Sequence, residues 1–281
     1  MTTRSCADGS RGSGVGCRRV LSSGSPTPDS RLPTPDVEST LMKSVIVIPA
    51  RWASSRFPGK PLAMIAGVSL IQRVFERASR SQRASAVVVA TDDDRIADHI
   101  ASFGGRFVRP LPKGAIDFQS GTDRIAASLD LLGEAYDQVI NVQGDEPMID
   151  VNAVDAVIDV LQATGVDMAT LAAPIESDDE WRSRDVVKVV TTLGGDALYF
   201  SRAPLTGAQR HVGVYGYQTS VLRALASLPP SPLELAESLE QLRALQNGLK
   251  IRVVQTTRPH LGVDRPEDVA RVEHELAKQA W

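Results

Sequence analysis

The stretch Ser44–Leu62, SVIVIPARWASSRFPGKPL, decides the fold. Its run Val45–Ile48 is apolar and β-branched throughout, which is typical of a strand buried on both faces of a parallel sheet. The strand ends at Pro49, and the loop that follows carries three cations, Arg51, Arg56 and Lys60. Ligands of open α/β sheets bind at the carboxyl ends of the strands, so these cations indicate a cradle for a polyanion. On charge alone, a solvated basic loop explains them equally well.

Length and composition describe an ordinary globular protein and exclude several classes of function. A chain of 281 residues can bury a large core. The net charge of −3 gives no broad basic surface, so we expect neither a nucleic-acid partner nor a membrane partner. Both cysteines, Cys6 and Cys17, lie near the amino terminus. The remainder therefore has neither a disulfide framework nor a thiolate metal site, which suits a reducing cytoplasm.

The order of predicted elements indicates one domain behind a tail. Residues 1–41 are rich in Ser, Gly, Pro and Arg and are predicted to be disordered, whereas residues 42–281 form a single domain. Apolar patterning predicts an alternation of strands (86–90, 106–108, 138–142, 167–173) with helices (70–79, 95–102, 151–163). This alternation is typical of a parallel sheet. Three strand-like runs then follow without helices between them (186–191, 197–201, 211–218), which predicts an antiparallel extension.

Helix starts and stops are also legible in the sequence. The acids that follow the strand 86–90 are predicted to cap the next helix rather than to bind a metal. The stretch 231–248, SPLELAESLEQLRALQNG, predicts one helix with its leucines in the core and Gly248 as its end. On spacing alone, Glu240 and Gln241 lie on its surface.

Two carboxylates stand where a metal ion would be needed. Asp145, in the run QGDEP (143–147), follows the predicted strand 138–142 directly. It either binds Mg²⁺ shared with substrate phosphates or stabilises its own turn. Asp264, in the run GVDRPED (262–268), either caps the terminal helix that has Pro266 in its first turn or provides the second metal ligand.

These motifs together resemble one known family. The basic loop 44–62, the turn QSGT (119–122), QGDEP (143–147), HVGVYGY (211–217) and GVDRPED (262–268) occur in the order found in the 3-deoxy-manno-octulosonate (Kdo) cytidylyltransferases. The resemblance covers residues 42–281. It implies a Rossmann-like nucleotidyltransferase fold, with a mostly parallel central sheet and an antiparallel sugar-binding subregion.

The same resemblance implies an activity and its partners. CMP would pass from CTP to the anomeric hydroxyl of Kdo, which gives CMP-Kdo and pyrophosphate for lipopolysaccharide inner-core synthesis. The family implies a cytoplasmic, Mg²⁺-dependent homodimer.

Residue roles follow from the resemblance position by position. The nucleotide would be held by Pro49, Ala50, Arg51, Arg56, Lys60, Ser120, Gly121 and Thr122. The catalytic residues would be Arg51, Lys60 and Asp145, with Mg²⁺ held by Asp145 and Asp264. The sugar would be oriented by Gln143, Arg202, His211, Tyr215, Glu240 and Gln241. Without the family, His211 would be interpreted as a structural strand residue.

The sequence departs from the family at two places. Phe118 stands where a His precedes the Gln-Ser-Gly-Thr turn, and the connection between Leu205 and His211 is short. A cytidylyltransferase for another acidic sugar, such as 8-amino-Kdo or a sialic acid, therefore remains an alternative. The other alternative is a catalytically silent nucleotide-binding paralogue, against which the presence of Arg51, Lys60, Asp145 and Asp264 argues.

Overall fold

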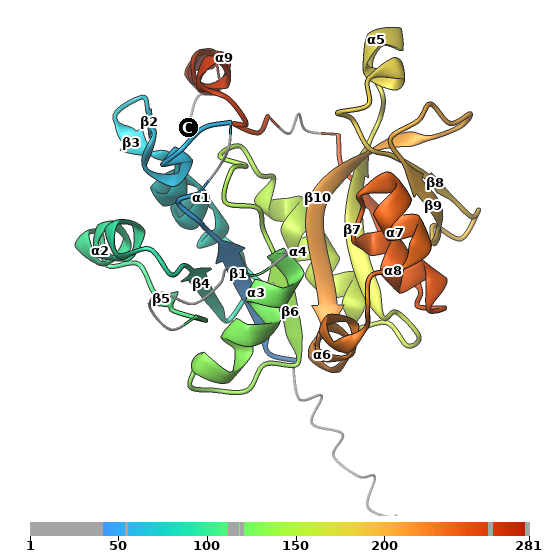
Figure 1. The fold of residues 1–281 in the computed structure, drawn as a ribbon, viewed down its shortest axis with the longest axis horizontal. Helices are drawn as coiled ribbons and strands as arrows, with labels where there is room; N and C mark the ends of the chain where they lie inside the picture. Colours follow the sequence, from blue (N-terminus) through green and yellow to red (C-terminus); the bar gives the residue numbers. More distant parts are fainter. Residues whose placement is uncertain (1–41, 54–55, 112–117, 119–120, 258–260, 279–281) are drawn as a thin grey trace, which may run out of the picture. The chain divides into compact units, whose positions relative to one another are not determined.

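The computed structural model describes residues 42–53, 56–111, 118, 121–257 and 261–278 (Figure 1). Contacts divide the chain into Met1–Thr40 and Leu41–Trp281, and all described residues belong to the second unit. The predicted disordered tail and Ser120 lie outside the described residues. No helix within the described ranges is long and apolar enough to cross a membrane.

The described residues form a nine-stranded, mostly parallel sheet, which confirms the predicted fold class. Its main path runs in the order β11 (Ile251–Gln255), β7 (Met168–Ala173), β10 (Gln209–Gln218), β6 (Gln138–Asn141), β1 (Ser44–Pro49), β4 (Ala86–Ala90) and β5 (Phe107–Val108). Strand β1 pairs in parallel with β6 and β4, and β7 pairs in parallel with β11. Strand β10 alone is antiparallel to both of its neighbours on this path, β6 and β7.

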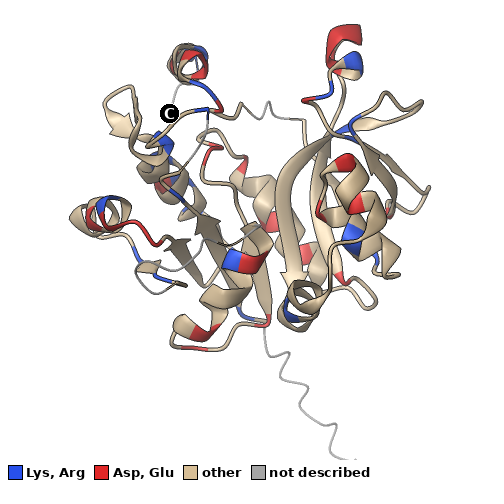
Figure 2. Cartoon of the chain, in the orientation of Figure 1, with Lys and Arg blue, Asp and Glu red and all other residues tan. Residues whose placement is uncertain are grey.

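Alternating side chains of β1 supply two hydrophobic clusters on opposite faces of the sheet. Ile46 and Ile48 join the cluster formed with α1 (Leu70–Ala78), α2 (Asp94–Ser102), α4 (Val151–Leu161) and α9 (Pro266–Lys278). Val45 and Val47 join the cluster formed with α3 (Gly121–Ser128), α6 (Thr219–Ser227) and the pair α7 (Pro232–Glu237) and α8 (Gln241–Gln246). All four β1 side chains are fully buried, as the apolar run predicted. Figure 2 shows that β1, β4 and β6 carry no charged residue.

Several smaller elements complete the described chain. The antiparallel part predicted for the second half is the hairpin of β8 (Lys188–Thr191) and β9 (Ala197–Ser201), in which β8 also pairs with β10. The short helix α5 (Asp178–Arg182) and the two-stranded β2 (Met64–Ile65) and β3 (Val68–Ser69) lie outside the main sheet. Two 3₁₀ helices span Lys60–Leu62 and Leu129–Leu131.

One predicted helix is wrong. Residues 231–248 form α7 and α8, separated at Ser238, whose φ of 54° places it in the left-handed region. A capping box at Ser231 begins α7, and Leu235 is 68% exposed rather than buried in the core. The prediction that an acid caps α2 is confirmed, because the Asp93 side chain accepts the Arg95 amide.

Candidate active site

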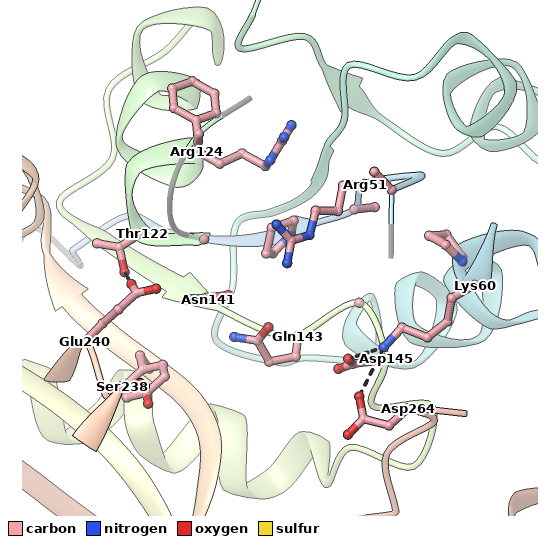
Figure 3. Close-up of a pocket in the computed structure, with 18 of the residues that line it drawn as sticks. Arg51, Lys60, Thr122, Arg124, Asn141, Gln143, Asp145, Ser238, Glu240 and Asp264 are labelled. Carbon is pink, nitrogen blue, oxygen red and sulfur yellow. Dashed lines mark hydrogen bonds and ion pairs between the residues drawn. The ribbon is translucent and has the colours of Figure 1, made fainter. Parts of the chain in front are cut away.

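A cavity of about 940 Å³ opens at the carboxyl ends of β1 and β6 (Figure 3). The predicted site residues that line it are Pro49, Ala50, Arg51, Arg56, Lys60, Gly121, Thr122, Gln143, Asp145, Tyr215, Glu240, Gln241 and Asp264. They come from segments spread over most of the chain, and the strand topology brings them together. The cavity therefore lies at the carboxyl ends of the parallel strands, where open α/β sheets bind their ligands.

The basic loop positions Lys60 through a tight turn at Gly59. Gly59 has a φ of 71°, and its amide donates to the Trp52 carbonyl oxygen at 3.1 Å. A Cβ atom on Gly59 would lie 2.9 Å from the Trp52 indole, so the turn requires glycine both for its φ and for its close approach. The Arg95 guanidinium lies over the Trp52 ring, 3.3 Å from the ring centre. The loop that carries Arg51 and Lys60 is thus fixed at its base.

Lys60 lies between the two predicted metal carboxylates. Its Nζ atom is 2.6 Å from Oδ2 of Asp145 and 3.5 Å from Oδ1 of Asp264 (Figure 3). Arg56 also contacts Oδ1 of Asp264, at 3.2 Å. Two carboxylates separated by 119 positions in the sequence therefore share one cation.

The backbone explains how the two carboxylates meet. The Val263 amide donates to the Asp145 carbonyl oxygen at 2.9 Å, which fastens the loop before α9 to the end of β6. At the start of α9, Asp268 accepts the amides of Asp264 and Arg265, each at 2.9 Å. The alternative in which the Asp264 side chain caps this helix is therefore wrong, and its carboxylate faces Lys60 and Arg56 instead.

The donor set fits a magnesium ion that is shared with a phosphate ligand. The described residues contain no group of three or more His, Cys, Asp or Glu side chains that could hold a metal by themselves. Mg²⁺ bound with substrate phosphates needs only one or two protein carboxylates, because phosphate oxygens and water complete its octahedron. The adjacent Glu146 adds little negative charge at neutral pH, since burial, together with the charge of Asp145, raises its pKa to about 8.

On the opposite side of the cavity, the corner between α7 and α8 presents polar side chains. Thr122, at the start of α3, donates its hydroxyl hydrogen to Oε2 of Glu240 at 2.5 Å (Figure 3). The corner is held by a buried ion pair in which Arg243 donates from Nε and from one terminal nitrogen to Glu234, at 2.8 and 2.5 Å. Gln241 is 4% exposed, so its prediction as a surface residue on helical spacing alone is wrong.

Two predicted sugar-binding residues do not line the cavity. Arg202 donates from Nε to the Glu237 carbonyl oxygen at 3.1 Å and from a terminal nitrogen to the Arg184 carbonyl oxygen at 3.2 Å. His211 lies behind Tyr215, with ring centres 5.3 Å apart, and its Nε2 is 2.9 Å from the Thr170 hydroxyl oxygen. Burial lowers the pKa of His211 to about 3, so the imidazole is neutral near pH 7.

Known proteins match this chain over most of its length. The cytidylyltransferase family model matches residues 45–251. A 3-deoxy-manno-octulosonate cytidylyltransferase of Syntrophotalea carbinolica is 47% identical over 253 residues, which is 84% of this chain and 99% of that protein. One from Myxococcus xanthus is 48% identical and covers 82% of this chain and 95% of its own length. The chain belongs to the 3-deoxy-manno-octulosonate cytidylyltransferase family.

The structural comparison agrees with membership of the 3-deoxy-manno-octulosonate cytidylyltransferase family. A solved structure of CMP:2-keto-3-deoxy-manno-octonic acid synthetase complexed with CTP is 39% identical, with a TM-score of 0.79. The match covers 85% of this chain and 100% of the solved one.

Sequence reasoning missed several residues that line the cavity of this 3-deoxy-manno-octulosonate cytidylyltransferase family member. Arg124 is buried on α3 and pairs with Asp92 at the end of β4. Asn141 ends β6, and Tyr217 lies two positions beyond Tyr215 on β10. The only signal for Asn141 was a carboxamide at a strand position where the alternation calls for an apolar residue. Arg124 had a clearer signal, because it lies two positions after Thr122 of the Gln-Ser-Gly-Thr turn.

Proposed function

We propose that this protein transfers CMP from CTP to the anomeric hydroxyl of Kdo, with release of pyrophosphate and formation of CMP-Kdo. Besides the similarity to known cytidylyltransferases, one structural observation supports this proposal. Lys60, Asp145 and Asp264 meet at the carboxyl ends of the sheet, inside a cavity that also contains Arg51. This is the arrangement of cations and carboxylates that a nucleoside triphosphate with bound Mg²⁺ requires.

The reaction needs alignment and charge neutralisation more than covalent catalysis. The anomeric oxygen attacks the α-phosphorus in line while the bond to the pyrophosphate oxygen breaks, and the hydroxyl proton is lost. Arg51 points into the cavity (Figure 3), and no described carboxylate pairs with it, so its guanidinium is available for phosphate oxygens. Lys60 neutralises charge on the same phosphates, and the fixed turn at Gly59 holds it ready to do so.

Asp145 and Asp264 would hold Mg²⁺, as their position around Lys60 supports. When bound, the ion would supply positive charge to the phosphates and lower the pKa of a bound hydroxyl. The two carboxylates would provide the negative charge that attracts Mg²⁺. Lys60 would then turn from the carboxylates toward the phosphates.

Residues on the side of β10 would orient the sugar. Gln143, Tyr215, Glu240 and Gln241 line the cavity, and the last two belong to the corner between α7 and α8. Carboxamide, phenol and carboxylate groups suit a ligand rich in hydroxyls. The assignments of Arg202 to the sugar carboxylate and of His211 to the sugar stay predictions, since both lie outside the cavity lining.

Three further properties belong to the same proposal. The enzyme acts in the cytoplasm, where CTP is made, and the product serves lipopolysaccharide inner-core synthesis. It works as a homodimer, as its resemblance to the family implies.

Pyrophosphate release tests the reaction and the choice of sugar together. The purified protein is incubated with CTP and Mg²⁺ and offered Kdo, 8-amino-Kdo or N-acetylneuraminate separately, with EDTA as control. Release with Kdo that EDTA abolishes supports the proposal. Release with another sugar alone moves the assignment to that sugar. Nucleotide binding without release from any of the three overturns the enzymatic proposal in favour of a silent nucleotide-binding protein.

A further inference from the structure

Strand β6 ends in a buried amide at a position where the packing pattern calls for an apolar side chain. Val139 joins the hydrophobic cluster on the side of α3, and Ile140 joins the cluster on the opposite face. Successive side chains of a strand alternate between faces, so Asn141 lies on the face of Val139. It is only 3% exposed. A carboxamide therefore occupies a site that a valine or leucine would otherwise fill.

The carbonyl oxygen of this amide has no partner. Oδ1 of Asn141 is buried, and no hydrogen-bond donor among the described residues reaches it. The same strand offers a direct contrast, because Gln138 is also fully buried but accepts a hydrogen bond from the Ser44 hydroxyl at 2.7 Å. Buried polar atoms are nearly always paired in folded proteins, and an unpaired one is destabilising. Asn141 also lines the cavity, so a bound ligand can supply the missing donor.

The surroundings of Asn141 indicate what kind of ligand group it meets. Figure 3 shows it between the contacting pair Thr122 and Glu240 and the side chain of Gln143. Across the sheet it is paired with Tyr215 of β10. Asn141 therefore belongs to the part of the cavity near β10 and α8, away from the ion pairs that Lys60 makes.

A second unpaired atom in the same cavity narrows the ligand chemistry. Nε2 of Gln241 is buried, lines the cavity and lacks a partner within the described chain. The cavity thus holds one unsatisfied acceptor and one unsatisfied donor. Hydroxyl groups can donate to the first and accept from the second, whereas an ionised phosphate can only accept. A polyhydroxylated sugar matches this pair of atoms.

We propose that Oδ1 of Asn141 accepts a hydrogen bond from a hydroxyl of the acceptor sugar and that Asn141 is a specificity-determining residue of this enzyme. The inference rests on the proposed function, because it takes Kdo as the acceptor. A sugar that lacks this hydroxyl leaves the buried carbonyl unpaired in the complex, and binding sites built on such contacts discriminate strongly against the deoxy analogue.

Asn141→Leu tests the proposal, since leucine has a similar size and no polar atom. We expect the KM for Kdo to rise about tenfold to hundredfold and the KM for CTP to change less than about twofold. The melting temperature should stay the same or rise, because an unpaired buried polar atom is removed. Asn141→Ala removes the acceptor without added bulk and should raise the KM for Kdo similarly.

Gln138→Leu is the matched control, in which a paired amide of the same strand is lost. The substitution leaves the buried Ser44 hydroxyl without its acceptor, so the melting temperature should fall while both KM values stay unchanged. A fall in melting temperature for Asn141→Leu as large as this control shows, without a change in the KM for Kdo, would make Asn141 structural and overturn the proposal.

Deoxy analogues of Kdo identify the hydroxyl. Analogues lacking the hydroxyl at carbon 4, 5, 7 or 8 are compared in the wild type and in Asn141→Leu. One analogue should have a much lower kcat/KM than Kdo in the wild type but the same kcat/KM as Kdo in the variant. For each of the other analogues, the decrease in kcat/KM relative to Kdo should be equal in both enzymes. Equal losses for every analogue, or a rise in the KM for CTP alone, would overturn the inference while the proposed reaction stands. Absence of wild-type turnover with Kdo would overturn both.

Discussion

The buried ion pair between Arg243 and Glu234 should stabilise the corner that carries Glu240 and Gln241. Both side chains are only 9% exposed, and Arg243 also donates to the carbonyl oxygens of Leu225 and Leu228, at 3.3 and 3.2 Å. Arg243→Ala removes these donors and leaves the Glu234 carboxylate buried without its cation. Loss of one partner of a buried pair costs about 3 to 5 kcal/mol.

Thermal unfolding followed by circular dichroism measures this cost. For a domain of this size the loss corresponds to a decrease in melting temperature of about 6 to 20 °C. Arg223→Ala provides the matched control, because Arg223 pairs with Asp130 on the surface, where the side chains are 49% and 71% exposed. Exposed pairs contribute about 0 to 1 kcal/mol, so this control should melt close to the wild type.

The pH dependence separates the ion pair from simple loss of packing. Burial raises the pKa of Glu234, but hydrogen bonds from Arg243 and from the Ser231 amide outweigh it, and the pKa lies below its usual range. The pair therefore stabilises the fold above the ordinary pKa of about 4.5, and this contribution is lost as pH falls through the lowered value. In Arg243→Ala the isolated carboxyl is protonated at higher pH, so the deficit should be smaller at pH 5 than at pH 8. A deficit below 1 kcal/mol, or one independent of pH, would refute the reasoning.

Three further changes test the loop, the metal site and the buried imidazole. Asp264→Asn should abolish at least 99% of pyrophosphate release yet cost only about 1 kcal/mol of stability, because Asp264 is half exposed; near-normal release at saturating Mg²⁺ would contradict its role. Gly59→Ala should raise the KM for CTP and cost about 1 to 3 kcal/mol, since the new Cβ meets Trp52 at a positive φ; unchanged kinetics would contradict the importance of the turn. With a pKa of about 3, His211 stays neutral from pH 5 to 8, so His211→Gln should leave the shape of the kcat/KM profile unchanged there, and a lost inflection would contradict this. Protonation of His211 in the unfolded state should reduce the free energy of unfolding below about pH 6.5 in the wild type. This contribution of His211 should be absent from His211→Gln.

Features set by short stretches of sequence were predictable. The buried strand 44–49, the turn after it and the Asp145 position follow from apolar runs and from residues next to them. These patterns are local, and the physical forces that they report act over a few residues. The meeting of Asp145 with Asp264 needed the family's motifs, because nothing near either residue specifies the other.

Features set by distant contacts were not predictable from the same patterns. Leu235, Leu239 and Leu242 have helical spacing, so a single helix fitted them, but Ser238 adopts the left-handed region instead. A non-glycine residue tolerates this conformation where the surrounding contacts hold it, and here the pair of Arg243 with Glu234 spans the break. Asn141 was missed for a related reason, since its burial depends on strands that pair with β6 from other parts of the sequence.

The antiparallel strand β10 also determines when the centre of the sheet can form during synthesis. It lies between β6 and β7, although it follows both in the sequence. Until the ribosome has made residue 218, β6 and β7 each expose an unpaired edge of backbone amides and carbonyls. The nascent chain must therefore wait for a non-local pairing, which slows folding and exposes it to aggregation. A chain interrupted before β10 would contain the basic loop and Asp145 but could not join β6 to β7 across the centre of the sheet.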